Sequence, residues 1–167
     1  DRSVPRLRYL SDIFGSSIAT HYSSNAVLAE AITQADMVIG AVLVPGASAP
    51  KLVSKAQLAT MKPGAVLVDV AIDQGGCFET SRPTTHDEPT YMVDGIVHYC
   101  VANMPGSVPR TSSEALNNAT LPHVIALAEK GVKALDDDLH LANGLNVAGG
   151  KIVYQAVLDA IGARPDA

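Results

Sequence analysis

The sequence predicts an α/β fold built around an open, parallel β-sheet. Two runs, residues 35–44 and 65–71, are almost entirely apolar, as central strands are when helices cover both faces of a parallel sheet. A segment with apolar residues at helical spacing precedes each run. Of the 167 residues, 47% are hydrophobic and only 17% are charged, so the chain can bury a core and fold as a globular protein.

The N-terminal elements are predicted from apolar spacing and from capping residues. Residues 4–14 form an amphipathic helix with arginines on its polar face, and Gly15 ends it. Residues 18–22 are predicted to form a short strand. The polar residues 23–25 then cap a helix over residues 26–33.

The central elements repeat the alternation of strand and helix. The strand at 35–44 is broken by Pro-Gly at 45–46, and a helix follows at 54–61. Further strands are predicted at 65–71 and 96–102. This alternation is typical of a parallel sheet with helices on both faces.

The pattern changes beyond Pro109, where long helical periodicities cover residues 113–130 and 152–161. The change predicts a domain boundary near residue 110. We therefore expect one domain over residues 1–109 and a helical segment over residues 110–167.

Composition excludes several classes of function. A formal net charge of −5 gives no basic surface for nucleic acid or anionic lipid, and the absence of Trp removes the best stacking platform for single strands. Gly and Pro break the longest apolar runs well short of the roughly 20 residues that a membrane span needs. No charged-then-apolar leader opens the chain. We expect a cytoplasmic protein without nucleic-acid or membrane partners.

The two cysteines indicate neither a metal site nor a disulfide. Cys77 and Cys100 are far apart, without a CxxC motif or a histidine at ligand spacing, so we expect no metal. Both are predicted to be reduced and to act as small buried apolar residues. The five histidines include no HExxH motif, and no serine lies in a GxSxG elbow.

Three segments rich in small residues follow the predicted strands, at residues 40–46, 68–77 and 99–105. Open α/β sheets bind ligands beyond the carboxyl ends of their strands, although Gly and Pro also end strands that bind nothing. Asp69 is predicted to cap a turn, whereas Asp73 either faces a substrate or caps the loop. Local sequence favours a solvent-exposed Arg82 over one paired with an acid.

The chain opens on an acidic residue that is followed directly by a helix. In dinucleotide-binding folds an acid at the end of the second strand binds ribose hydroxyls, about 20 residues after a glycine-rich turn. No GxGxxG motif occurs in the 167 residues. Asp1 alone therefore does not establish such a fold.

Several longer stretches together resemble the L-alanine dehydrogenase family. They are residues 35–46 (ADMVIGAVLVPG), 49–53 (APKLV), 61–69 (MKPGAVLVD), 71–77 (AIDQGGC), 81–85 (SRPTT), 99–105 (YCVANMP) and 115–122 (ALNNATLP). The resemblance fades after about residue 130. It implies the second half of a Rossmann-type, doubly wound NAD-binding domain, with the C-terminal helices returning to a discontinuous substrate domain.

The resemblance also implies an activity and a set of site residues. The family oxidises L-alanine to pyruvate and ammonium with NAD, runs the reverse amination, and assembles mainly as hexamers. Asp73 is implied as the catalytic residue, orienting substrate, water or a partner histidine. The residues implied to bind the cofactor are Asp1, Arg6, Ser23, Val42, Leu43, Val70, Asp73, Arg82, Val101, Asn103 and Met104.

The family's other catalytic groups, a lysine, a histidine and a carboxylate-binding arginine, belong to an N-terminal part that this sequence does not contain. We therefore expect this chain alone to be inactive and to bind NAD weakly. Asp1 would favour NAD over NADP, because its carboxylate repels a 2′-phosphate. The alternatives are the NAD(H)-binding domain of a proton-translocating transhydrogenase and a noncatalytic nucleotide-binding module.

Overall fold

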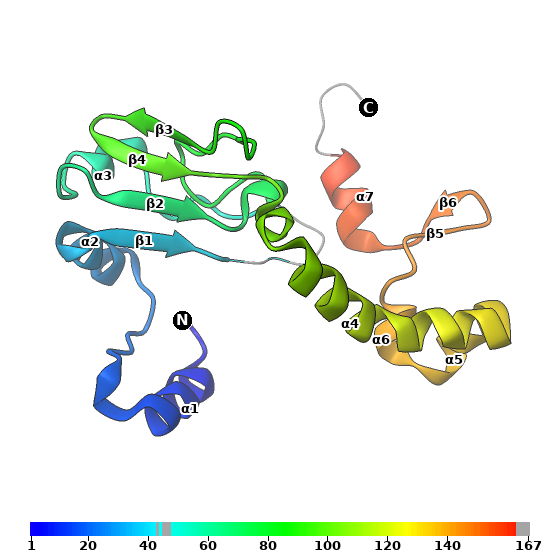
Figure 1. The fold of residues 1–167 in the computed structure, drawn as a ribbon. Coiled ribbons are helices and arrows are strands. Elements are labelled where there is room, and N and C mark those ends of the chain that lie inside the picture. The colour runs from blue at the N-terminus through cyan, green and yellow to red at the C-terminus, as the bar shows by residue number, and fades with distance from the viewer. Residues whose placement is uncertain (43, 45–47, 163–167) are drawn as a thin grey trace. The chain divides into compact units, whose positions relative to one another are not determined.

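A computed structural model describes residues 1–42, 44 and 48–162 of the chain (Figure 1). The chain divides into two compact units, one of residues 1–42 and 50–102 and the other of residues 43–49 and 103–167. Apart from residues 43–49, the second unit covers the chain from residue 103, seven residues before the predicted start at residue 110. The assignment of its helices to a substrate domain stays a prediction.

The first unit contains a four-stranded sheet in the order β1-β2-β4-β3 (Figure 1). Strands β1 (Met37–Gly40), β2 (Val66–Asp69) and β4 (Ile96–Tyr99) are mutually parallel, and β3 (Thr90–Val93) runs antiparallel to β4. The predicted α/β fold is confirmed. The sheet is mixed rather than purely parallel.

The hairpin between β3 and β4 was not predicted, although the sequence contains a signal for it. Asp94 and Gly95 both have positive φ, at 50° and 80°. This is the conformation of a two-residue type I′ turn, for which Asp-Gly is a preferred pair. Strand β3 follows Pro89 directly and lies at the edge of the sheet, where a short polar-and-apolar segment is sufficient.

Strand β1 is shorter and more exposed than its apolar sequence predicts. It pairs with β2 alone among the described strands, and Met37 and Ile39 are 56% and 63% exposed. A strand at the edge of the sheet has a neighbour on one side only. In the structure described, the run is therefore not the central strand that was predicted.

Serine side chains cap the first two helices of the first unit. Helix α1 (Val4–Phe14) is capped by Ser3 and ends at Gly15, before a single 3-10 turn, η1 (Gly15–Ser17). The hydroxyl of Ser24 caps α2 (Asn25–Gln34) by accepting a hydrogen bond from the Val27 N–H.

Helix α3 (Lys55–Leu58) is only one turn long, shorter than the predicted helix at 54–61. Ser54 and Gln57 form its capping box. The backbone N–H groups of Thr60 and Met61 donate to carbonyls three residues earlier, so the chain continues as tight turns.

The predicted strand at residues 18–22 is not formed. Among the described residues, its hydrogen bonds to another segment are made with Asp1: the Ser23 N–H donates to the Asp1 carbonyl at 2.8 Å, and the Asp1 amino group donates to the His21 carbonyl at 3.3 Å. A strand requires a neighbour along its length, and one residue does not supply it.

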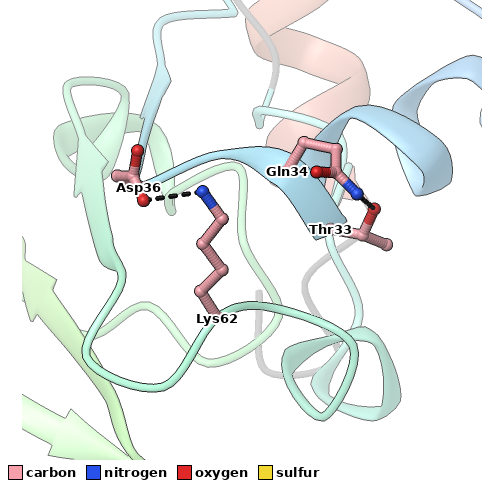
Figure 2. A network of polar contacts seen from close by, with 4 residues as sticks. All are labelled: Thr33, Gln34, Asp36 and Lys62. Atoms are coloured by element: carbon pink, nitrogen blue, oxygen red, sulfur yellow. Dashed lines mark hydrogen bonds and ion pairs between the residues drawn. The ribbon is translucent and has the colours of Figure 1, made fainter.

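The core lies on one face of the sheet. Alternate residues of β2 and β4 are buried on this face, together with side chains from the helices and loops that connect the strands. Its largest fully buried apolar side chains are Phe78, Ile32, Leu58, Leu67, Ile96, Val53 and Val101. On the surface, the Lys62 ammonium contacts the Asp36 carboxylate at 2.8 Å, joining the start of β1 to the turn before β2 (Figure 2). Because both side chains are largely exposed, this ion pair adds little stability.

The second unit is mainly helical. Its elements are η3 (Met104–Ser107), α4 (Pro109–Lys130), η4 (Gly131–Lys133), α5 (Ala134–Asp137), α6 (Leu139–Ala142), a hairpin of β5 (Val147–Ala148) and β6 (Lys151–Ile152), and α7 (Gln155–Gly162). The two predicted long helices correspond to α4 and α7. None of the described helices has the length and hydropathy to cross a membrane.

Candidate functional site

The three parallel strands end at one edge of the sheet. Gly40 at the end of β1 pairs with Asp69 at the end of β2, and the pairing continues when the Val70 N–H donates to the Gly40 carbonyl at 2.8 Å. Beyond β4, Val101 pairs with Thr84. Within the first unit, residues 41–42, 70–77 and 100–102 directly follow these strands, and residues 81–84 lie beside them. This edge of the sheet is called the rim, and it is where open α/β sheets bind their ligands.

Glycine is required at the end of β1. A Cβ atom on Gly40 would lie 2.1 Å from the Cys77 Sγ and 2.7 Å from the Phe78 Cζ. The loop after β2 therefore packs directly on the backbone of β1, an approach that only glycine permits.

Asp69 organises that loop from the inside. Its carboxylate is fully buried and accepts hydrogen bonds from the backbone N–H groups of Ala71 at 3.1 Å and Cys77 at 2.9 Å, and from the Ser81 hydroxyl. The Phe78 N–H adds a longer contact at 3.4 Å. A buried carboxylate is tolerated when several donors satisfy it. The prediction that Asp69 caps a turn is confirmed.

Two consecutive glycines complete the loop. Gly75 has φ +89°, and Gly76, with φ +74°, lies so close to Asp69 that a Cβ would be 2.8 Å from its Oδ2. The Lys51 ammonium donates to both glycine carbonyls. The Gly-Gly pair thus lets the chain fold tightly over a buried carboxylate, with Lys51 fixing its outer side.

Asp73 lies at the exposed turn of this loop, in the 3-10 turn η2 (Ile72–Gln74). Its side chain is exposed, and no hydrogen bond or ion pair engages it within the described part of the chain. Asp73 is therefore not a structural cap. Its carboxylate is available at the rim on a loop that Asp69 holds in place.

The Arg82 side chain is exposed, and its guanidinium lies over an aromatic ring. Its Cζ lies 4.0 Å from the centre of the Tyr91 ring, and its backbone N–H donates to the Tyr91 hydroxyl at 2.8 Å. The side chain is still exposed, as the local sequence predicts, and no described carboxylate forms an ion pair with it.

Burial shifts the pKa of two groups near the rim so that each favours its neutral form. Burial and the adjacent Asp69 carboxylate raise the pKa of the Cys77 thiol to about 12. Burial lowers the pKa of His98, whose Nδ1 faces the Ile96 carbonyl and whose Nε2 faces the Thr80 hydroxyl. Both cysteines are free and buried, as predicted. Within the described ranges, no group of His, Cys, Asp and Glu is placed to hold a metal ion.

Comparison with known proteins identifies the family. The sequence matches the family described as alanine dehydrogenase/PNT, C-terminal domain, over residues 1–155. The chain belongs to this family. It is 63% identical over 163 residues to an alanine dehydrogenase of Halomonas elongata, covering 97% of this chain and 44% of that protein.

Solved structures give the same result. An L-alanine dehydrogenase matches with a TM-score of 0.82 at 52% identity, covering 97% of this chain and 45% of that one. A transhydrogenase from Sinorhizobium meliloti matches with a TM-score of 0.62 at 26% identity, covering 89% and 41%. The alanine dehydrogenase/PNT chain thus spans less than half the length of these relatives. The resemblance predicted from sequence is confirmed, and with it the Rossmann-type fold.

At the N-terminus of this alanine dehydrogenase/PNT domain, two of the predicted residues lie together. The Asp1 carbonyl accepts from the Ser23 N–H, and the Asp1 carboxylate accepts from the Ser3 N–H at 2.7 Å. Arg6 lies in the first turn of α1, with its guanidinium 4.9 Å from the Tyr9 ring centre. Asp1 and Arg6 are both exposed.

The remaining predicted site residues differ in accessibility. Val70 is 48% exposed at the rim, whereas Val101 is only 1% exposed and can offer a ligand its backbone alone. Val42 is half-buried after β1, and Leu43 lies outside the described residues. Asn103 and Met104 belong to the second unit, at the start of η3.

Sequence reasoning missed three residues that hold the rim: Lys51, Ser81 and Tyr91. Ser81 and Tyr91 flank Arg82 in space, but they are separated from each other by ten positions in the chain. The Asp-Gly turn at 94–95 was the available signal, because the hairpin it predicts brings Tyr91 back toward the end of β4.

Proposed function

We propose that this chain is the second half of the cofactor-binding domain of an NAD-dependent L-alanine dehydrogenase, followed over residues 110–167 by helices of its substrate domain. The reaction converts L-alanine, NAD⁺ and water to pyruvate, ammonium, NADH and a proton, and also runs in reverse. The observation that carries the proposal is the unpaired Asp73 carboxylate on its Asp69-anchored loop, in a chain 63% identical to a protein named alanine dehydrogenase.

The rim has the features that a dinucleotide requires. Gly40 lets the Cys77 and Phe78 side chains pack directly on the end of β1, and Gly76 lets the loop pass close to the Asp69 carboxylate. Arg82, which forms no ion pair within the described residues, supplies a cation for phosphate. Asp1 would bind the adenosine ribose hydroxyls, with Arg6 and Ser23 near it, which favours NAD over NADP. The residues proposed to line the rest of the cleft are Val42, Leu43, Val70, Val101, Asn103 and Met104.

Asp73 is the proposed catalytic residue. Bound NAD would supply the acceptor for the hydride that leaves the alanine Cα. The Asp73 carboxylate would hold the substrate amino group, the attacking water or a partner histidine in a fixed orientation. The buried hydrogen bonds of Asp69 keep that carboxylate in place during turnover.

The sequence has no glycine-rich GxGxxG turn to position a pyrophosphate at a helix N-terminus. We therefore expect the 167-residue chain by itself to bind NAD weakly and to be inactive. A chimera supplies the test. In it, this chain replaces the matching 163-residue stretch of the Halomonas elongata alanine dehydrogenase.

The chimera is assayed for NADH formation from L-alanine and NAD, and for hydride transfer from NADH to an NADP analogue. Alanine-dependent NADH formation supports the proposal. Hydride transfer between nucleotides without alanine oxidation would instead favour the transhydrogenase alternative, which the 26% identical structural match supports more weakly. A chimera that binds NAD but performs neither reaction would favour a noncatalytic nucleotide-binding module.

We further propose that the protein is a homo-oligomer, a hexamer as in the family. Helix α4 is 22 residues long and has no buried residue, while its Leu116 and Val124 are 65% and 56% exposed. Apolar side chains exposed over such a length are covered in a stable protein. Light scattering of the chimera measures its mass, and a monomer would contradict this proposal.

A further inference from the structure

A single tyrosine holds both the backbone and the side chain of Arg82. The Tyr91 hydroxyl accepts from the Arg82 N–H at 2.8 Å and donates to the Thr80 carbonyl at 2.9 Å. The face of the same ring carries the Arg82 guanidinium, whose Cζ is 4.0 Å from the ring centre. This distance is well inside the range of a cation–π interaction.

Tyr91 is in turn fixed from within the fold. It lies directly opposite His98 across the β3–β4 pair, and the two rings are stacked with their centres 4.9 Å apart. His98 is fully buried, and hydrogen bonds at both ring nitrogens, to Ile96 and Thr80, set its orientation. The Tyr91 ring under Arg82 is therefore half-buried and is held against a fully buried side chain.

The charge on Arg82 is not neutralised by the protein. Its side chain is exposed, and none of the ion pairs in the described residues includes it. Beside it lies a cavity of about 150 Å³ lined by Arg82, Pro83, Thr84, Thr85, Glu88 and Thr90. The guanidinium carbon lies over the Tyr91 ring, and no hydrogen bond within the described residues engages the guanidinium N–H groups, which can therefore donate to an anion.

We propose that Tyr91 is a positioning residue, which fixes Arg82 so that its guanidinium edge meets the phosphate oxygens of the bound dinucleotide. This inference rests on the proposed NAD-binding function. A flexible arginine would lose rotamer freedom on binding, whereas an arginine already held on a ring loses less. Removing the ring should weaken nucleotide binding only while Arg82 is present.

The test is a double-mutant cycle in the chimera. The dissociation constant of NADH is measured by fluorescence titration for the unsubstituted protein, Tyr91→Leu, Arg82→Ala and the double variant. We expect Tyr91→Leu to weaken NADH binding about three- to tenfold, the range of a partly exposed cation–π interaction. In the Arg82→Ala background the same substitution should change the dissociation constant less than twofold.

Further variants separate positioning from folding. Tyr91→Phe keeps the ring and loses the hydroxyl, so it should weaken binding less than Tyr91→Leu does. Met92→Ala changes the neighbouring residue of β3, whose side chain is 67% exposed, and should leave NADH binding unchanged. In the 167-residue chain, the Arg82 Nε–Hε resonance should carry an upfield ring-current shift that Tyr91→Leu removes and Tyr91→Phe keeps.

The outcomes distinguish this inference from the proposed function. Arg82-dependent weakening supports it even if the chimera does not oxidise alanine, in which case only the proposed activity fails. Equal weakening by Tyr91→Leu in both backgrounds would overturn it, because Tyr91 would then be merely structural. An unchanged dissociation constant in Tyr91→Leu, or in Arg82→Ala, would overturn it as well.

Discussion

The Ser81 hydroxyl donates a hydrogen bond to the buried Asp69 carboxylate, twelve positions earlier in the chain. Asp69 also holds the loop that carries Asp73, and Ser81 directly precedes Arg82. One buried carboxylate therefore positions two segments of the rim together. The candidate site therefore depends on the Asp69 carboxylate, which is buried and does not itself face a ligand.

Removing this hydroxyl should cost stability. Ser81→Ala leaves one oxygen of a buried carboxylate with a missing donor, so we expect the free energy of unfolding to fall by about 1.5–3 kcal/mol, the range for hydrogen bonds to charged groups. Urea unfolding followed by circular dichroism measures the change. Ser113→Ala, at an exposed position of α4, is the matched control and should change stability by less than about 0.5 kcal/mol.

Adding one methyl group at the end of β1 should disturb the loop after β2. Gly40→Ala places a Cβ where Cys77 and Phe78 already lie, so we expect a loss of about 1–3 kcal/mol from overpacking. Cys77→Ala removes the nearer obstacle, and in the double variant part of the stability should return. Additive losses in the double variant would show that the contact does not limit this position.

Neither cysteine should react while the chain is folded. Both thiols are fully buried, and the raised pKa of Cys77, about 12, keeps it protonated at pH 8. Titration with a disulfide reagent should find no fast-reacting thiol in buffer and two in denaturant. A fast thiol in buffer would indicate that the loop opens on the time scale of the reaction.

Acid should destabilise the fold through His98. Burial lowers its pKa in the folded state, and the charge of Arg82 lowers it further, while the Ile96 carbonyl and Asp69 oppose the shift. The unfolded chain therefore binds the proton first, below about pH 6.5. Stability falls as pH drops from there to the folded pKa, by at most about 1.4 kcal/mol per pH unit.

The contribution of His98 is measured by comparing urea unfolding at pH 7.5 and 5.5. His98→Gln should lose stability at pH 7.5 but show a smaller further loss on acidification than the unsubstituted chain. His21→Gln, at an exposed position, is the control and should retain the full acid effect. An equal acid effect in all three proteins would assign it to other groups.

Sequence patterns predicted the elements that depend on local signals. The capping residues at 23–25, the Gly15 stop and the apolar strand at 65–71 each depend on neighbouring residues, and the structure confirms each of them. The segment at 18–22 has strand-like residues but lacks a partner strand in the described structure. Strand formation depends on what lies beside a segment, which the segment's own sequence does not encode.

In the candidate site, too, the residues with local signals were predicted and those that depend on distant segments were not. Asp69 was predicted to be a cap because an acid directly after an apolar strand must be satisfied. Tyr91 and Ser81 could not be assigned to the rim, because their roles arise only when the β3–β4 hairpin and the Asp69 loop fold back on Arg82. These contacts join segments that are distant in the sequence, so they depend on how the strands and loops are arranged in the fold.

The rate of NADH formation from L-alanine by the chimera, with and without Asp73→Asn, tests the central claim most directly. The substitution keeps the size of the side chain and removes its charge. We expect the unsubstituted chimera to turn over alanine and Asp73→Asn to lower kcat by about 10²–10⁴-fold, the contribution of a positioned acid–base group. Because the Asp73 side chain is exposed and forms no hydrogen bond or ion pair within the described residues, stability should change little. An active chimera with unchanged kcat after Asp73→Asn would contradict the account.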